Sequence, residues 1–128
     1  MYGIVAVDDM HFNAQDFHKG FVRVQAEELT VEAILKSLRE GRYYSSQGPE
    51  IHQMGFDGET LRVEFSPVKR AAFMTNTWYV KDRVRLAENG EYLTCAEYKV
   101  KPRDKWVRFE ATDESGKACW SNYIKVRD

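Results

Sequence analysis

The segment Ile51–Phe65 reads IHQMGFDGETLRVEF and has the pattern of a complete β-hairpin. Asp57-Gly58 separates two runs rich in apolar residues, and glycine accepts the positive φ angles that a tight hairpin turn requires. From Leu61 to Phe65, apolar and charged residues alternate, which is the period of a strand with one buried face. This stretch predicts two antiparallel strands.

Similar turn-forming dipeptides recur toward the C-terminus, where Asn89-Gly90 and Ser115-Gly116 predict two further hairpin turns. About seven short strands result, at the spacing typical of immunoglobulin-like domains. They are Ile51–Phe56, Thr60–Phe65, Val68–Thr75, Asp82–Ala87, Glu91–Val100, Trp106–Thr112 and Lys117–Val126. We therefore expect a mainly β fold, an antiparallel immunoglobulin-like β-sandwich. Its predicted core contains Phe65, Phe73, Leu86, Tyr98, Phe109 and Trp120.

A helix is predicted before the sandwich, between Thr30 and Gly41. Thr30 is a favourable N-cap, and Gly41 is placed to end the helix in the left-handed conformation. Leu29 and Ile34 have the spacing of a hydrophobic staple. One apolar stripe follows from the spacing of Val31, Ile34, Leu35 and Leu38.

The N-terminal segment has a different pattern. Gly3–Val7 is a continuous apolar run, typical of a strand covered on both faces in a parallel α/β sheet, and Phe21–Gln25 predicts a second strand. If the first strand continues, Asp9 and His11 share a face, where a carboxylate and an imidazole are suitable ligands for Zn²⁺, Mn²⁺ or Fe²⁺. A polar turn with no metal is the alternative, because such pairs are common by chance.

Composition narrows the classes of partner. The 128 residues include 19 basic and 20 acidic side chains, a net charge of −1, and no run approaches the ~18 apolar residues of a membrane helix. We expect neither a membrane nor a nucleic-acid partner, although basic and aromatic residues are interleaved from Tyr98 to Trp106. Cys95 and Cys119 are expected to be reduced thiols in a cytoplasmic protein.

Trp78 and Tyr79 are adjacent aromatic residues between two predicted strands. Their rings could stack on a sugar or insert into a protein partner, which would make the chain a stand-alone binding module. Anchoring of an edge strand is the structural alternative.

Two pieces of the sequence, GIVAVDDMHF at Gly3–Phe12 and the segment Leu29–Ile51 with its YSSQGPEI junction, resemble the C-terminal part of bacterial PHP (polymerase and histidinol phosphatase) metallophosphoesterases. The ending, from Arg108–Asp113 through Ala118–Asn122, is similar to the β-sandwich that follows the barrel in that group. The resemblance covers nearly the whole chain.

The resemblance implies that residues 1–48 are the last strand, metal-ligand turn and helix of a distorted α/β barrel, and that residues 49–128 are an accessory sandwich. Asp9 and His11 would be the last ligand pair of a site for up to three divalent metals, with Asp8 as a carboxylate that orients a ligand or has a structural role. The earlier motifs, beginning with His-x-His, have no counterpart here. We therefore expect this chain to lack phosphoesterase activity by itself and to need the missing barrel as its partner. An isolated N-terminal strand would pair with a sheet edge in its own chain or with a second copy.

Overall fold

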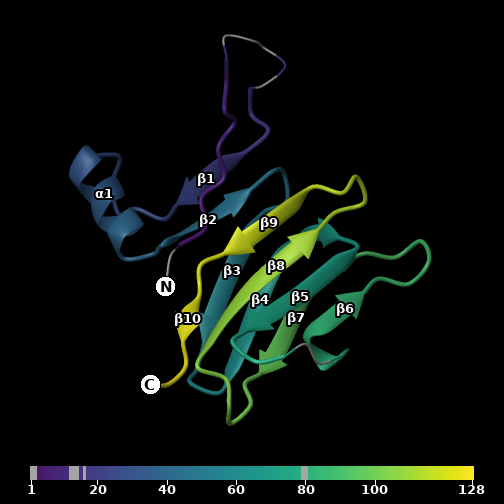
Figure 1. Ribbon diagram of the computed structural model, residues 1–128. Coiled ribbons are helices and arrows are strands. Elements are labelled where there is room, and N and C mark those ends of the chain that lie inside the picture. The colour runs from purple at the N-terminus through teal and green to yellow at the C-terminus, as the bar shows by residue number, and fades with distance from the viewer. Residues whose placement is uncertain (1–2, 12–14, 16, 79–80) are drawn as a thin grey trace.

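The computed structural model describes residues 3–11, 15, 17–78 and 81–128, and its strands form two antiparallel sheets (Figure 1). Sheet A has seven strands in the order β1-β2-β9-β8-β5-β6, with β10 paired to β8, and sheet B has three in the order β3-β4-β7. The predicted antiparallel sandwich is confirmed. The strands are β1 (Phe21–Val24), β2 (Tyr43–Ser46), β3 (Ile51–Phe56), β4 (Thr60–Val68), β5 (Arg70–Thr75), β6 (Val84–Leu86), β7 (Leu93–Lys99), β8 (Trp106–Thr112), β9 (Ala118–Ser121) and β10 (Ile124–Lys125). The helices are α1 (Val31–Arg39) and the 3₁₀ helix η2 (Lys81–Arg83).

The core lies between the sheets, where β4 contacts β8 and β7 contacts β5. Stacked and tilted aromatic rings fill its centre: the Phe109 centroid is 5.0 Å from that of Phe65 and 5.5 Å from that of Phe73, and Phe73 is 5.6 Å from Tyr98. All four are buried, as predicted. These side chains come from both sheets, so the core joins the two layers into one unit.

Two predicted core residues are not in the core. Leu86 is 69% exposed because it ends the three-residue edge strand β6. Trp120 is only partly buried, since Cys119 and not Trp120 points inward from β9. Cys119 pairs with the buried Ala111, which sets this parity. The prediction that placed Trp120 in the core is therefore out of step with β9 by one residue, and such a shift moves every side chain of a strand to the opposite face of the sheet.

Of the three predicted hairpin turns at glycine, two are confirmed and one is not. Gly58 and Gly116 have φ angles of 95° and 86° and connect β3 to β4 and β8 to β9, as predicted. Gly90 also forms a turn, with a φ of 77°, but β6 pairs with β5 in sheet A and β7 pairs with β4 in sheet B. The predicted hairpin there is wrong, because this turn carries the chain from one sheet to the other.

A second change of sheet lies between β4 and β5. The predicted strand Val68–Thr75 is instead divided, since Val68 ends β4 opposite Leu93 and Arg70 begins β5 opposite Leu86 and Thr112. An irregularity in the β4–β7 ladder before Val68 accompanies the bend.

The hairpin of β1 and β2 extends sheet A beyond β9, and α1 is the connection between its two strands (Figure 1). Thr30 caps α1 by accepting a hydrogen bond from the Ala33 N–H at 3.2 Å, and Gly41 follows the helix with a φ of 73°, so both predicted helix ends are confirmed. The predicted staple is wrong, because Leu29 is 94% exposed.

Candidate functional site

Residues 3–11 are extended but form no strand, so the predicted N-terminal strand is wrong. β1 and β9 already occupy both edges of β2, so the segment cannot pair with that strand. The buried Ser45 of β2 holds it instead: its hydroxyl accepts from the Ala6 N–H at 3.1 Å and donates to the Ile4 carbonyl at 2.6 Å. The segment therefore covers part of the outer face of sheet A.

Asp8 organises the loop that returns from this segment to β1. Its carboxylate accepts hydrogen bonds from the N–H groups of His18, Lys19 and Gly20 at 2.7, 2.5 and 2.7 Å. The Gly20 N–H contributes most to lowering the pKa of Asp8. A Cβ at Gly20 would lie 2.7 Å from the Val7 carbonyl oxygen, so this close approach requires glycine. The observed contacts give Asp8 a structural role in the loop.

Asp9 and His11, the predicted metal ligands, come just after Asp8 in the chain. Asp9 has a φ of 51°, which interrupts the extended conformation that would have placed its side chain on the same face as that of His11. The His11 Nδ1 atom instead lies 2.7 Å from the backbone carbonyl oxygen of Asp9. In the part of the chain that the structure describes, no three histidine, cysteine or acidic side chains are grouped as a metal site. The assignment of Asp9 and His11 as ligands in a larger protein stays a prediction.

Trp78 has a 92% exposed side chain on a backbone that is firmly held. The guanidinium of Arg83 donates to the carbonyl oxygens of Thr77 and Trp78 at 3.1 and 3.0 Å. Asn76 adds bonds to the Arg103 carbonyl and the Lys105 N–H. The predicted partner ring, Tyr79, lies outside the described residues.

A buried polar network below Trp78 was not predicted from the sequence. The Asp104 carboxylate, fully buried, is 3.2 Å from the guanidinium of Arg83 and accepts from the Tyr98 hydroxyl at 2.7 Å and from the Lys101 N–H at 2.8 Å. The Thr77 hydroxyl donates to its other oxygen at 3.1 Å. The contacts join the β7–β8 connection to strand β7, to the 3₁₀ helix η2 and to the segment after β5, so the network fixes the end of the sandwich where these parts meet.

The network also changes the acidity of its members. Burial raises the pKa of Asp104, but the Lys101 N–H and the hydroxyl groups of Tyr98 and Thr77 outweigh it, and the pKa lies below its usual value. Burial and the hydrogen bond to Asp104 raise the pKa of Tyr98 to about 12. The lowered pKa favours the ionised carboxylate of Asp104 and the raised pKa favours the neutral hydroxyl of Tyr98, and burial closes the network to a substrate.

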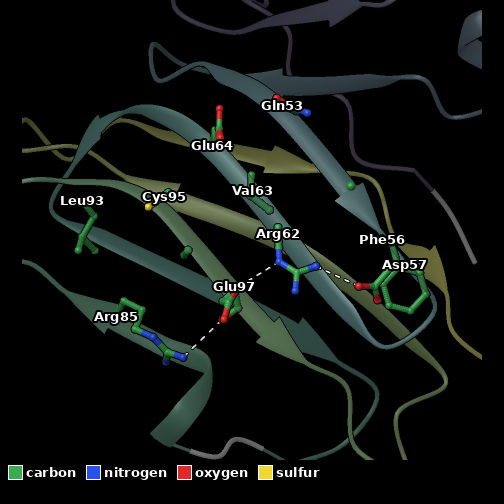
Figure 2. A pocket seen from close by; sticks show the side chains of 12 residues that line it. Gln53, Phe56, Asp57, Arg62, Val63, Glu64, Arg85, Leu93, Cys95 and Glu97 are labelled. Atoms are coloured by element: carbon green, nitrogen blue, oxygen red, sulfur yellow. Dashed lines mark hydrogen bonds and ion pairs between the residues drawn. The ribbon is translucent and has the colours of Figure 1, made fainter.

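A hollow of about 900 Å³ lies over sheet B, and Figure 2 shows the side chains that line it. Gly55 is one of its lining residues, and a Cβ there would have no atom within 4 Å. Arg62 crosses the hollow between Asp57 and Glu97, with nitrogen–oxygen distances of 3.0 and 3.2 Å. Two carboxylates thus already neutralise the arginine, and the hollow is not an anion site.

A second groove, of about 600 Å³, lies between β3 and the β1–β2 hairpin. Tyr44 pairs with Arg23 on one side and with Ser121 on the other, so these three side chains share the face of sheet A that is turned toward sheet B. From sheet B, the groove is lined by Ile51, His52, Gln53 and Met54.

Comparisons with models of protein families, with curated proteins and with solved structures give no match. The fold and its surfaces therefore carry the functional argument. Among the helices of the described residues, none has the length and apolar character needed to cross a membrane.

Exposed apolar side chains are unevenly distributed. Most of the large ones lie in the first third of the chain, in the extended segment, the loop before β1 and the helix α1. They are Val5, Val7, Met10, Phe17, Leu29, Val31, Leu35 and Leu38, which we call the N-terminal apolar surface. In α1 the buried side chain is that of Ser37, whose hydroxyl donates to the Gln25 carbonyl at 2.8 Å. The helix thus leaves Val31, Leu35 and Leu38 of its apolar stripe exposed, whereas Ile34 is partly buried.

Proposed function

We propose that this chain is the C-terminal part of a PHP-type metal-dependent phosphoesterase, in which the sandwich is an accessory domain and the N-terminal apolar surface packs on the catalytic barrel. The supporting observation is the exposure of Val31, Leu35 and Leu38 on α1 together with that of Val5 and Val7. Burying one such side chain contributes about 1.5–3 kcal/mol, and a nine-residue helix is marginal without packing. A covering partner explains why this sequence has an amphipathic helix at all.

The ligand types fit divalent metal chemistry, but their number does not. A carboxylate and an imidazole, as in Asp9 and His11, suit Zn²⁺, Mn²⁺ or Fe²⁺, whereas a catalytic site needs about three protein ligands. Bound metal would supply acidified water and charge stabilisation at a phosphoester. The remaining ligands must come from the barrel, so these residues alone are inactive.

The first experiment assays the purified 128-residue chain with Mn²⁺ or Zn²⁺ and p-nitrophenyl phosphate. Turnover should not exceed that of the same metal without protein. The second uses the protein encoded when the reading frame is extended upstream to include a His-x-His barrel. There, Asp9→Ala and His11→Ala should lower kcat by at least about a hundredfold, while Glu28→Ala, an exposed matched control, should not. Efficient turnover by the short chain, or an extended protein insensitive to both substitutions, would contradict the proposal.

A stand-alone binding module is the second candidate, and the exposed Trp78 ring on its anchored backbone favours it. Such a ring stacks on a sugar or inserts into a protein with little loss of backbone entropy. A glycan array that binds the native chain and loses its signal with Trp78→Ala would support this candidate, and an unchanged signal would remove it.

A further inference from the structure

The segment after β5, the helix η2, the β7–β8 connection and the C-terminal segment meet at one end of the sandwich, the lower end in Figure 1. The Asn76 side chain joins the first of these to the β7–β8 connection, with its amide nitrogen 3.2 Å from the carbonyl oxygen of Arg103. Arg127 joins the C-terminal segment to the same connection by donating to the Pro102 carbonyl oxygen at 3.0 Å. We call this surface, which carries the exposed ring of Trp78, the Trp78 end. It comprises residues 76–78, 81–83, 100–105 and 125–128.

Positive charge without a counter-ion gathers at the Trp78 end. Lys101 is paired there with Asp82 at 2.7 Å. Lys125 is paired with Asp128. Four other basic side chains are exposed, and none of them pairs with a carboxylate in the part of the chain that the structure describes: Lys81, Arg103, Lys105 and Arg127. The Trp78 end is therefore positive, although the whole chain has a net charge of −1.

The backbone that carries the Trp78 ring is fixed before any ligand arrives. Arg83 donates to the carbonyl oxygens of Thr77 and Trp78, and Arg83 is itself held by the buried carboxylate of Asp104. A ligand that stacks on the ring therefore does not have to order the loop beneath it. A fluid lipid surface accepts a ring in many orientations, so this rigid support favours a ligand of defined shape.

A nucleic-acid strand needs more exposed rings than this end provides. Proteins that bind single strands stack successive bases on several aromatic side chains. Basic and aromatic residues are interleaved in residues 98–106, but Tyr98 is buried in the core and Trp106 is partly buried. Trp78 is the one large apolar side chain exposed among the described residues of the Trp78 end. A single flat ring is sufficient to stack on one sugar.

We propose that the Trp78 end binds an acidic polysaccharide, in which a sugar ring stacks on Trp78 and carboxylate or sulfate groups pair with the four unpaired cations. The guanidinium groups of Arg103 and Arg127 match the two oxygens of such anions, and the lysines add point charges. The inference rests on the second candidate function, the binding module, and names its class of ligand. It does not depend on the catalytic barrel.

The test begins with a glycan array probed with the 128-residue chain. The array carries polygalacturonate, alginate, hyaluronate and heparin beside neutral glucans and galactans. The acidic glycan that gives the strongest signal is then titrated by calorimetry beside its esterified or desulfated form, which keeps the sugar rings but removes the charges. The charged form should bind at least about tenfold more tightly. Its binding should weaken as salt is raised, because the Debye length falls to about 3 Å at 1 M.

Variants separate the ring from the charges. Trp78→Ala should weaken binding by about tenfold or more, and Trp78→Phe, which keeps a flat ring, should restore most of the affinity. Arg103→Gln combined with Lys105→Gln removes two charges but keeps the backbone groups that bond to Asn76, and it should also weaken binding by about tenfold or more. Lys117→Gln is the matched control, because Lys117 is an exposed cation in the turn at the opposite end of β8 and β9, and its affinity should be unchanged. Circular dichroism and the unfolding midpoint confirm that the variants are folded.

Four results would overturn the proposal: no acidic glycan bound, equal affinity for the charged and neutral forms, affinity unchanged by Trp78→Ala, or affinity unchanged by loss of the two cations. Neutral glycans bound through Trp78 would leave the second candidate function in place and remove only the acidic ligand. Phosphatidylglycerol vesicles and an oligothymidine are the remaining probes. Binding of either one in place of the glycans would assign the Trp78 end to that class of partner and overturn the proposal.

Discussion

Asp104→Asn should be among the most destabilising single substitutions in this chain. The substitution keeps the size of the side chain but removes the negative charge beside the guanidinium of Arg83, which is only 4% exposed. The new amide also turns donor hydrogens toward a site that Tyr98 and Lys101 supply with donors. Leaving a buried charge without its partner costs about 3–5 kcal/mol, against a total stability of about 5–15 kcal/mol.

The measurement is urea unfolding followed by tryptophan fluorescence, with the midpoint and slope fitted separately. We expect the free energy of unfolding to fall by about 3–5 kcal/mol and Tm to fall by roughly 10–20 °C. Asp82→Asn is the matched control, because Asp82 pairs with Lys101 at 2.7 Å on the exposed surface. An exposed pair contributes about 0–1 kcal/mol, so this variant should resemble the native chain.

A double-mutant cycle isolates the ion pair. Replacing both partners, as Arg83→Met with Asp104→Leu, should cost less than the sum of the single changes, because no uncompensated charge is left. A loss below about 1 kcal/mol for Asp104→Asn, or strict additivity in the cycle, would refute this account of the network.

The dependence of stability on pH in the acid range gives an independent check of the role of Asp104. Because the pKa of Asp104 is lower in the folded protein than in the unfolded chain, its stabilisation is complete above its usual value of 3.8 and is lost as pH falls through the folded value. The native chain should lose stability there, whereas Asp104→Asn should show a smaller change over the same pH range.

Three further predictions follow from single groups. The pKa of Tyr98 rises from 10.0 to about 12 on folding, so its contribution is intact below pH 10 and lost between pH 10 and 12; alkaline urea titrations should show this loss, and Tyr98→Phe should reduce it. A thiol reagent should modify the exposed Cys95 at once and Cys119 only on unfolding, because burial raises the pKa of Cys119 to about 12; equal rates would contradict this. Thr30→Ala should lower the stability of α1 by about 1 kcal/mol, measured by hydrogen exchange in residues 31–39, and unchanged exchange would show that the cap is dispensable.

The sequence predicted the parts of the fold that depend on a local period. Phe65 and Phe109 lie in strands whose alternation was clear, and both are in the core. It predicted the β3–β4 and β8–β9 hairpins but not how the other strands would pair. The turn at Gly90 requires a positive φ whether it closes a hairpin or carries the chain to the other sheet, so the dipeptide alone cannot distinguish these cases.

The candidate sites also differ in how far the sequence could predict them. The interpretation of Gly3–Val7 as a buried strand assumed neighbours on both sides, and the structure shows Ser45 holding an extended segment instead. The Asp104 network arises where loops from different strands converge, so no spacing along the chain could reveal it. A buried tyrosine in a predicted core strand, Tyr98, was its one sequence signal, since its hydroxyl requires a partner.

The order of strands in sheet A makes the N-terminal apolar surface depend on the sandwich that the Asp104 network stabilises. β2 is attached to the sandwich through β9, with Ser45 opposite Trp120, and in the ladders of the described strands β1 pairs with β2 alone. The first third of the chain therefore folds on a sandwich that must already be formed, and it adds few apolar contacts in return. Loss of Asp104 should unfold both regions together, whereas loss of the Thr30 cap should release α1 alone. That asymmetry would follow if, as proposed, the apolar side of this segment packs against a partner.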